Sequence, residues 1–218
     1  LTRTLDDAGV VALRGWVDDI ASWPDDGDGW LHHRERTPAG PALCRSENLI
    51  PFHEGLRRLL TEGSMLETAS ALLGEPAVLY KEKINYKLPG GGGYAPHQDA
   101  PAYPFIDAHV SCMVAVDDAT VENGCLEVVP ACHHEVLPMD DAGCIAPDVV
   151  ASLPWQPVEV PAGFSFTLTG RTTTRALMRW DDAAELRVTL IDRVVQHGMR
   201  SHVFQYAWTD ARGAARAV

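Results

Sequence analysis

Beyond Pro76, the chain consists of short β-like runs separated by Gly, Pro and Asp. Several short strands at such spacing, with turn residues between them, are typical of a sandwich or barrel. The runs lie at residues 77–87, 109–116, 125–129, 157–160, 164–169, 187–195 and 202–208. This part of the chain is therefore predicted to form a jelly-roll-like double sheet.

The N-terminal part has a different pattern. Apolar residues recur at helical spacing over residues 1–23 and again over residues 52–73, with a turn or loop at 25–29. Gly74 and then Pro76 end the second region. We therefore expect a mainly β fold in one domain of 218 residues, with 1–75 as a mostly helical support for a core formed by 76–218.

Composition excludes several classes of partner. Hydrophobic residues make up 46% of the chain, enough for a sizeable core, and the net charge of −12 includes no basic run of the kind that binds nucleic acid. No membrane partner is expected, because no apolar run approaches the roughly 18 residues of a membrane span. The first residues hold no apolar signal core, and the odd count of five cysteines without a CxxC pair indicates reduced thiols. A cytoplasmic protein of open oligomeric state is expected.

His97 and Asp99 stand two residues apart, directly after a glycine-rich turn. In an extended strand this spacing points both side chains the same way. A histidine and a carboxylate supply two of the three ligands in the 2-His-1-carboxylate facial triad of non-haem Fe(II) oxygenases. The pair is therefore a candidate metal site, although an HxD motif alone is weakly specific.

Four consecutive glycines, Gly90 to Gly93, precede this pair. They allow backbone conformations closed to other residues. A flexible loop, a phosphate-cradling loop and a loop that aims His97 and Asp99 into a cavity are the three interpretations. No GK[ST] follows the glycines, which disfavours the phosphate loop.

Together with the motifs around it, this region resembles the phytanoyl-CoA dioxygenase family of Fe(II)/2-oxoglutarate oxygenases. The resembling segments are KINYKLPG (83–90), HQDAPAY (97–103), VDD (116–118), ENGCLEVVP (122–130) and PAG (161–163). They cover roughly residues 80–163. The resemblance implies a double-stranded β-helix (cupin-like jelly-roll) fold, a mononuclear Fe(II), 2-oxoglutarate as co-substrate and O2 as oxidant.

The resemblance also implies that His97 and Asp99 are metal ligands. Three facial ligands leave three positions on the metal for the 2-oxo acid and O2. Halogenases that resemble the family lack the carboxylate, which leaves room for chloride. Because Asp99 is present here, hydroxylation or another oxidation is favoured over chlorination.

The third metal ligand is where the chain departs from the family pattern. The family has a distal histidine on the strand after Pro-Ala-Gly, but residues 172–174 of this chain are all threonine. In an alternative register the distal strand ends at His197, with His202 as the next candidate. We predict His197, because the chemistry requires a third ligand and only these two histidines lie beyond His134.

The choice between these two alignments of the distal strand also decides which arginine is predicted to bind 2-oxoglutarate. An arginine of the family pairs with the far carboxylate through its planar fork, and the candidates here are Arg187 and Arg200. Alternation over residues 81–87 sends Lys81, Lys83 and Asn85 to one face of a strand. Either the lysine face is solvated, or Lys83 or Asn85 contacts the co-substrate or an anionic substrate.

Further residues could complete the pocket. Ser111 could hydrogen-bond the co-substrate from the next strand, and Gln98, Tyr103 and Trp155 could line its mouth. The adjacent pair at 133–134 matches a family position where the histidine is not normally an iron ligand, so a structural or substrate-lining role is favoured.

We therefore predict an Fe(II)/2-oxoglutarate-dependent dioxygenase that hydroxylates or oxidatively cyclises a small molecule. Natural-product tailoring is favoured as its role, with oxidation of a phosphonate or an acyl thioester as alternatives. A second hypothesis is a metal-free or non-catalytic family member that binds a small molecule, which the threonines at 172–174 motivate. A third is a hydrolase or isomerase with another divalent metal on a cupin-like barrel.

Overall fold

The computed structural model describes most of the chain. The described residues are 1–25, 27, 29–88, 91–92, 94–98, 108–130, 136–142, 144–171, 177–179, 186–194, 208–209 and 215–216. The backbone alone is described for residues 108–109, 168–171, 177–179, 186–194, 208–209 and 215–216.

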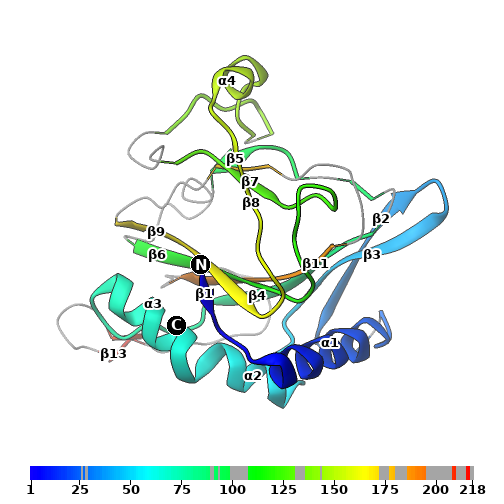
Figure 1. Ribbon diagram of the computed structural model, residues 1–218, viewed down its shortest axis with the longest axis vertical. Helices are drawn as coiled ribbons and strands as arrows, with labels where there is room; N and C mark the ends of the chain where they lie inside the picture. Colours follow the sequence, from blue (N-terminus) through cyan, green and yellow to red (C-terminus); the bar gives the residue numbers. More distant parts are fainter. Residues whose placement is uncertain are drawn as a thin grey trace.

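Two antiparallel β-sheets face each other across the middle of the molecule (Figure 1). The large sheet has seven strands in the order β1-β9-β6-β11-β4-β3-β2, and the small sheet has four in the order β5-β10-β7-β8. A further pair, β12 with β13, stands apart from both. Because the strand neighbours are mostly not consecutive in sequence, the chain crosses repeatedly between the sheets.

The strands of the large sheet are β1 (Thr2–Arg3), β2 (Leu31–Thr37), β3 (Gly40–Glu47), β4 (Lys81–Lys87), β6 (Ala108–Ala115), β9 (Phe164–Arg171) and β11 (Leu186–Val194). Those of the small sheet are β5 (His97–Gln98), β7 (Leu126–Val128), β8 (Gln156–Val158) and β10 (Leu177–Arg179). The separate pair is β12 (Trp208–Thr209) and β13 (Ala215–Arg216).

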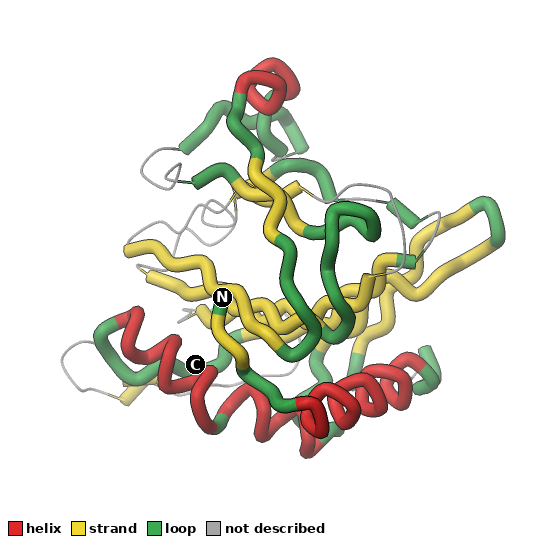
Figure 2. Tube along the Cα trace, in the orientation of Figure 1, coloured by secondary structure: helices red, strands yellow, loops and turns green. Residues whose placement is uncertain are grey.

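Helices α1 (Asp7–Ala21), α2 (Glu54–Thr61) and α3 (Gly63–Leu73) cover the face of the large sheet that points away from the small sheet (Figure 2). The short α4 (Pro147–Ser152) lies beyond the small sheet. Asp6 caps α1 by accepting a hydrogen bond from the Gly9 N–H at 2.8 Å. Gly74 ends α3 in the left-handed conformation with φ of 76°, which a residue without Cβ adopts at little cost.

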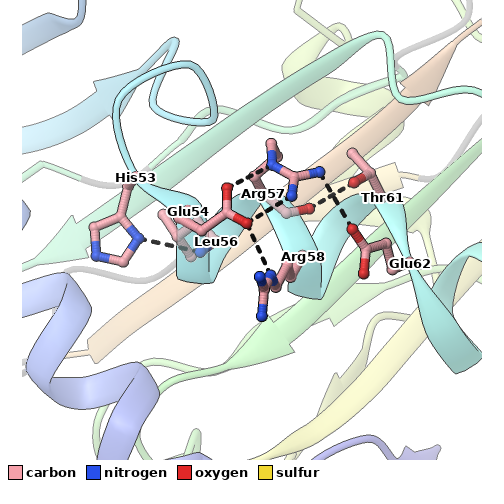
Figure 3. A network of polar contacts seen from close by, with 7 residues as sticks. All are labelled: His53, Glu54, Leu56, Arg57, Arg58, Thr61 and Glu62. Atoms are coloured by element: carbon pink, nitrogen blue, oxygen red, sulfur yellow. Dashed lines mark hydrogen bonds and ion pairs between the residues drawn. The ribbon is translucent and has the colours of Figure 1, made fainter.

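His53 caps α2 in the same way as Asp6 caps α1. Its Nδ1 accepts a hydrogen bond from the Leu56 N–H at 3.1 Å, and the carboxylate of Glu54 pairs with both Arg57 and Arg58 on the first two turns (Figure 3). The bond from Leu56 satisfies one of the N-terminal backbone donors of this eight-residue helix, and the ion pairs of Glu54 link side chains along its surface.

Two apolar layers hold the sheets and helices together. The larger one lies between the helices and the large sheet and includes Leu13, Val17, Leu56, Ile84 and Val114, all fully buried. The smaller one lies between the two sheets, around the buried residues at 113, 115, 125, 126 and 160. Each buried aliphatic side chain of this kind contributes about 1.5–3 kcal/mol relative to its exposed form.

The structure corrects the predicted N-terminal part. Residues 31–47 form the hairpin of β2 and β3, which extends the large sheet, where mostly helical structure was expected. The first helix begins at Asp7 rather than residue 1, because residues 2–3 pair with β9, and the second helical region is divided at Glu62. The hairpin was missed because its strands are largely polar and do not alternate strictly between apolar and polar residues.

Six of the predicted β-like runs correspond to strands of the structure. β4, β6, β7, β8, β9 and β11 all lie within about four residues of the predicted runs. Cys44, Cys112, Cys125 and Cys144 are free thiols. In the described part of the chain, no helix has the length and apolar character needed to cross a membrane.

Candidate active site

The candidate site lies on the face of β4 that points toward the small sheet. Alternation holds along this strand as predicted: Ile84 and Tyr86 belong to the helix-side core, whereas Lys83 and Asn85 have the opposite parity. Tyr94, which packs with the apolar layer between the sheets, reaches Asn85 from the other side. This parity turns the polar side chains of β4 toward the inter-sheet space.

Asn85 is the most deeply buried polar residue of this face, with 1% of its surface exposed. Its Oδ1 accepts a hydrogen bond from the Tyr94 hydroxyl at 3.1 Å. Its Nδ2 has no hydrogen-bond partner among the described residues. A buried amide donor without an acceptor costs roughly 1–3 kcal/mol, which a ligand carboxylate would recover.

His97 begins β5, the edge strand of the small sheet. Its Nδ1 lies 2.8 Å from the carbonyl oxygen of Ala95. Because a carbonyl oxygen can only accept, Nδ1 is the donor in this contact. Metal-bound histidines are commonly oriented by such a bond from the other ring nitrogen. His97 therefore fits a metal ligand that binds through Nε2.

The glycine-rich segment before His97 is held by two charged side chains of the large sheet. The Gly92 N–H donates to Oε2 of Glu35 in β2 at 2.8 Å, and Nζ of Lys87 donates to the Gly92 carbonyl oxygen. A Cβ on Gly91 would clash with Oε1 of Glu35. The small glycines let the carboxylate of Glu35 approach the backbone at Gly91 and Gly92, and a loop that aims His97 and Asp99 into a cavity stays a prediction.

Ser111 and Arg187 take different positions in the large sheet. Ser111 is buried in β6 and pairs with Asp192 of β11, in the same parity as Asn85. The backbone of Arg187 pairs with Tyr86, the parity of the helix-side core. Ser111 thus joins Lys83 and Asn85 on the inter-sheet face, and the role of Arg187 stays a prediction.

The other predicted residues either form hydrogen bonds with nearby loops or lie outside the described residues. The Oε1 of buried Gln98 accepts from the Leu137 N–H at 2.9 Å, and Nε1 of Trp155 donates to the Val150 carbonyl at 3.0 Å. These side chains fasten the loops around the small sheet. The predicted positions Asp99, Tyr103, His133, His134, Thr172–Thr174, His197, Arg200 and His202 lie outside the described residues.

The predicted metal centre is thus described only at His97. Within the described ranges, no three His, Cys, Asp or Glu side chains gather closely enough to hold a metal ion. Two of the three predicted ligands, Asp99 and His197, are not among those ranges.

A cluster of charged residues joins the hairpin to Lys81 of β4, and its hairpin members were not singled out in the sequence. Oε1 of Glu47 lies 2.8 Å from Nε of Arg45 and 3.4 Å from Nζ of Lys81, and Oε2 lies 3.9 Å from Nε2 of His33. We call these four residues the basic cluster. Arg45 pairs in register with Asn85, and Glu47 with Lys83. The cluster therefore continues the polar inter-sheet face of β4 onto β3 and β2.

The cluster could be found from sequence only once the hairpin is recognised. Period-two alternation in β3 and β4 then places Arg45 and Glu47 beside Asn85 and Lys83. A register shift between His33 and Arg34 makes this difficult to infer from residue spacing, because the bulge reverses the parity of β3 beyond it.

Comparison with known proteins identifies the family to which this fold and site belong. The model of the phytanoyl-CoA dioxygenase (PhyH) family matches residues 3–172, most of the chain. The chain belongs to the phytanoyl-CoA dioxygenase family. The resemblance inferred from the sequence motifs is confirmed.

Two curated relatives of this PhyH-family chain act on phosphonates, as their names state. It is 51% identical over 164 residues to methylphosphonate hydroxylase of Gimesia maris and 35% identical over 164 residues to 2-aminoethylphosphonate dioxygenase of the uncultured bacterium HF130_AEPn_1. The alignments cover 75% and 73% of this chain. The chain spans 63% of the length of each relative.

A solved structure confirms the fold of the family in this chain. The epimerase SnoN, crystallised in complex with Fe3+, alpha ketoglutarate and nogalamycin RO, superimposes with a TM-score of 0.68 over 88% of this chain and 77% of its own. Its sequence identity to this PhyH-family chain is 21%, so the likeness concerns the fold alone. The expected cofactors, iron and 2-oxoglutarate, are those present in that protein.

Proposed function

We propose that this chain is the oxygenase part of an Fe(II)/2-oxoglutarate-dependent enzyme that oxidises a C–H bond in a small phosphonate. The observation that carries this proposal is the polar inter-sheet face formed by Lys83, Asn85 and the basic cluster, which offers cationic and amide donors. The bond from Tyr94 to Asn85 joins this face to the segment that leads to His97. Phosphonate relatives at 51% and 35% identity support the choice of substrate class. We infer further that the two sheets form the jelly-roll of this enzyme.

His97 would hold the metal through Nε2, with Asp99 and His197 as the other two ligands. The bond from Nδ1 to the Ala95 carbonyl fixes the ring and its tautomer before the metal arrives. Bound Fe(II), with 2-oxoglutarate and O2, supplies the oxidation that replaces a C–H bond by C–OH.

The chain's own residues would bind and orient the co-substrate. The Nδ2 group of Asn85 and the Ser111 hydroxyl are hydrogen-bond donors for a carboxylate, and Lys83 adds a positive charge on the same face. Arg187 or Arg200 would pair with the far carboxylate of 2-oxoglutarate. Apolar packing between the sheets keeps water from this space, which strengthens each charged contact.

Anaerobic addition of Fe(II) and 2-oxoglutarate tests the metal site through the weak visible charge-transfer band of the chelate. We expect the band in the unmodified protein and in the control His53→Asn, and its loss in His97→Ala. His197→Ala tests the third ligand separately: full iron affinity and 2-oxoglutarate decarboxylation in that variant would show that the His197 register is wrong. Absence of the band in the unmodified protein would favour a non-catalytic binding protein.

Product analysis then tests the substrate class. We expect succinate to form only when methylphosphonate or 2-aminoethylphosphonate is present. The second product should be a hydroxylated phosphonate. Natural-product tailoring is the second candidate, because the SnoN structure holds nogalamycin RO. Turnover restricted to natural products of this kind would reject the phosphonate proposal, and turnover without 2-oxoglutarate or O2 would reject the oxygenase.

A further inference from the structure

The basic cluster carries more positive than negative charge in a strongly acidic protein. Arg45 and Lys81 share one carboxylate, that of Glu47, while the whole chain has a net charge of −12. Burial, with a further contribution from Arg45, lowers the pKa of His33, so this ring is neutral at physiological pH. Among the described side chains, Glu47 is therefore the one carboxylate that forms ion pairs with Arg45 and Lys81.

The ion pairs of the cluster do not use all of its hydrogen-bonding groups. Arg45 Nε and Glu47 Oε1 are within coulombic reach, yet in the described part of the protein neither atom has a hydrogen-bond partner. The side chain of Glu47 is 12% exposed, whereas those of Arg45 and Lys81 are 29% and 34% exposed. The carboxylate is thus covered and holds the two cations, which keep surface available to an anion.

The position of the cluster connects it to the candidate active site. Arg45 is directly opposite Asn85 in the β3–β4 ladder, so their Cβ atoms are about 4.5–5.5 Å apart. Asn85 in turn bonds to Tyr94, three residues before His97. An anion bound by Arg45 and Lys81 would therefore lie next to the amide of Asn85.

We propose that Arg45 and Lys81, held in place by Glu47, bind the phosphonate group of the substrate. This inference rests on the proposed function. A phosphonate offers three oxygens in a tetrahedral arrangement, which suit the planar fork of an arginine together with the point charge of a lysine. The reacting carbon of a small phosphonate is close to phosphorus, so its anionic group must be held near the metal site.

The carboxylates of 2-oxoglutarate share this anionic chemistry, and the experiment must distinguish the two ligands. Steady-state kinetics of the iron-loaded protein, with methylphosphonate and 2-oxoglutarate varied separately, gives a KM for each. A ³¹P NMR titration of methylphosphonate with the metal-free protein measures binding without turnover. The variants are Arg45→Gln, Arg45→Lys and Lys81→Met, with Arg34→Gln as control, since Arg34 of β2 pairs with Asp25 outside the cluster.

Arg45→Gln is expected to raise the KM for methylphosphonate and its ³¹P dissociation constant by about tenfold or more, because it removes a charged hydrogen-bond donor. Arg45→Lys keeps the charge but loses the fork, so a smaller increase is expected. The KM for 2-oxoglutarate and all values of Arg34→Gln should not change. If Arg45→Gln does not fold, Lys81→Met replaces it in the test, with the same expected increase in the KM and the dissociation constant for methylphosphonate.

Two results would overturn the inference: a rise in the KM for 2-oxoglutarate in place of that for the phosphonate, or no change in either. The second result, with phosphonate turnover intact, would reject the site and leave the proposed function standing. Phosphonate binding that Arg45→Gln abolishes, in a protein that oxidises no phosphonate, would support the site and reject the proposed reaction.

Discussion

Glu35 and Gly92 are 57 residues apart in the sequence, yet the Gly92 N–H donates a 2.8 Å hydrogen bond to Oε2 of Glu35. This bond fastens the segment that leads to His97 onto strand β2. With Lys87 on the carbonyl side of the same residue, the large sheet holds both polar groups of one residue. The hairpin is thereby part of the support of the proposed metal site.

Loss of this bond should weaken metal binding. Glu35→Ala removes a charge-assisted acceptor and releases the backbone ahead of His97, so Fe(II) affinity is expected to fall roughly tenfold, the low end for partners that orient a metal ligand. Isothermal titration with Fe(II) under anaerobic conditions measures it. Glu35→Gln, which keeps an acceptor oxygen, is the matched control; equal losses in both variants would argue against the hydrogen bond as the cause.

The close approach of Glu35 also predicts a coupling with Gly91. Gly91→Ala places a Cβ against Oε1 of Glu35, whose contact with Gly92 must then give way. The cost in free energy of unfolding should be smaller in a Glu35→Ala background, by roughly 0.5–3 kcal/mol, the usual coupling of contacting residues. The double-mutant cycle is measured by denaturant unfolding of the unmodified protein, the two single variants and the double variant. Identical costs in both backgrounds would contradict the contact.

The Asn85 amide makes a prediction for co-substrate binding. Asn85→Ala removes the buried Nδ2 donor that has no partner in the described structure, and the KM for 2-oxoglutarate is expected to rise about tenfold. Tyr94→Phe removes only the bond that orients this amide, so a smaller rise is expected. Initial rates of succinate formation measure both. A larger effect of Tyr94→Phe would place the tyrosine, rather than the amide, on the co-substrate.

Glu82 makes stability depend on pH. Its Oε1 accepts hydrogen bonds from the backbone N–H groups of Leu49 and Ile50, but burial dominates and raises the pKa of the carboxyl above its ordinary value of 4.5. The folded state therefore binds the proton more tightly than the unfolded state, and stability falls as pH rises from 4.5 through the raised pKa.

Glu82→Gln should remove this loss while keeping an acceptor for both backbone donors. The free energy of unfolding of the variant, relative to that of the unmodified protein, should thus increase as pH rises through that window. Urea unfolding at several pH values measures it. A difference that is independent of pH would mean that Glu82 does not titrate between the two states in this window.

His53 makes stability depend on pH in the opposite sense. Burial lowers the pKa of its ring from 6.5, and protonation of Nδ1 would remove the acceptor that caps α2. Because the unfolded state binds the proton more tightly, this contribution is complete above pH 6.5 and is lost as pH falls from there through the lowered pKa.

His53→Asn supplies a cap that does not titrate in this range. The unmodified protein is therefore expected to lose up to about 1 kcal/mol more than the variant on acidification, the usual worth of an N-cap. Trp16 packs against His53 with ring centroids 5.5 Å apart, so tryptophan fluorescence reports the same region. Parallel pH profiles of the two proteins would contradict a titrating cap.

The sequence alone determined the elements whose signals are local. Alternation placed Lys83 and Asn85 on one face of β4, and helical periodicity located α1 within residues 1–23 and both α2 and α3 within residues 52–73. The motifs from KINYKLPG to PAG determined the family, because they combine several specific residues at fixed spacing. His97 was singled out in this way, and its role as a metal ligand stays a prediction.

The tertiary structure decided what depends on contacts between distant segments. Residues 31–47 form a polar hairpin whose strands gain their register from β4, so their own pattern did not reveal it. The bond between Glu35 and Gly92, and the meeting of Arg45, Glu47 and Lys81, follow from that register. A one-residue shift reverses the face of every side chain in a strand, and for this reason only the folded chain shows which charges share the site.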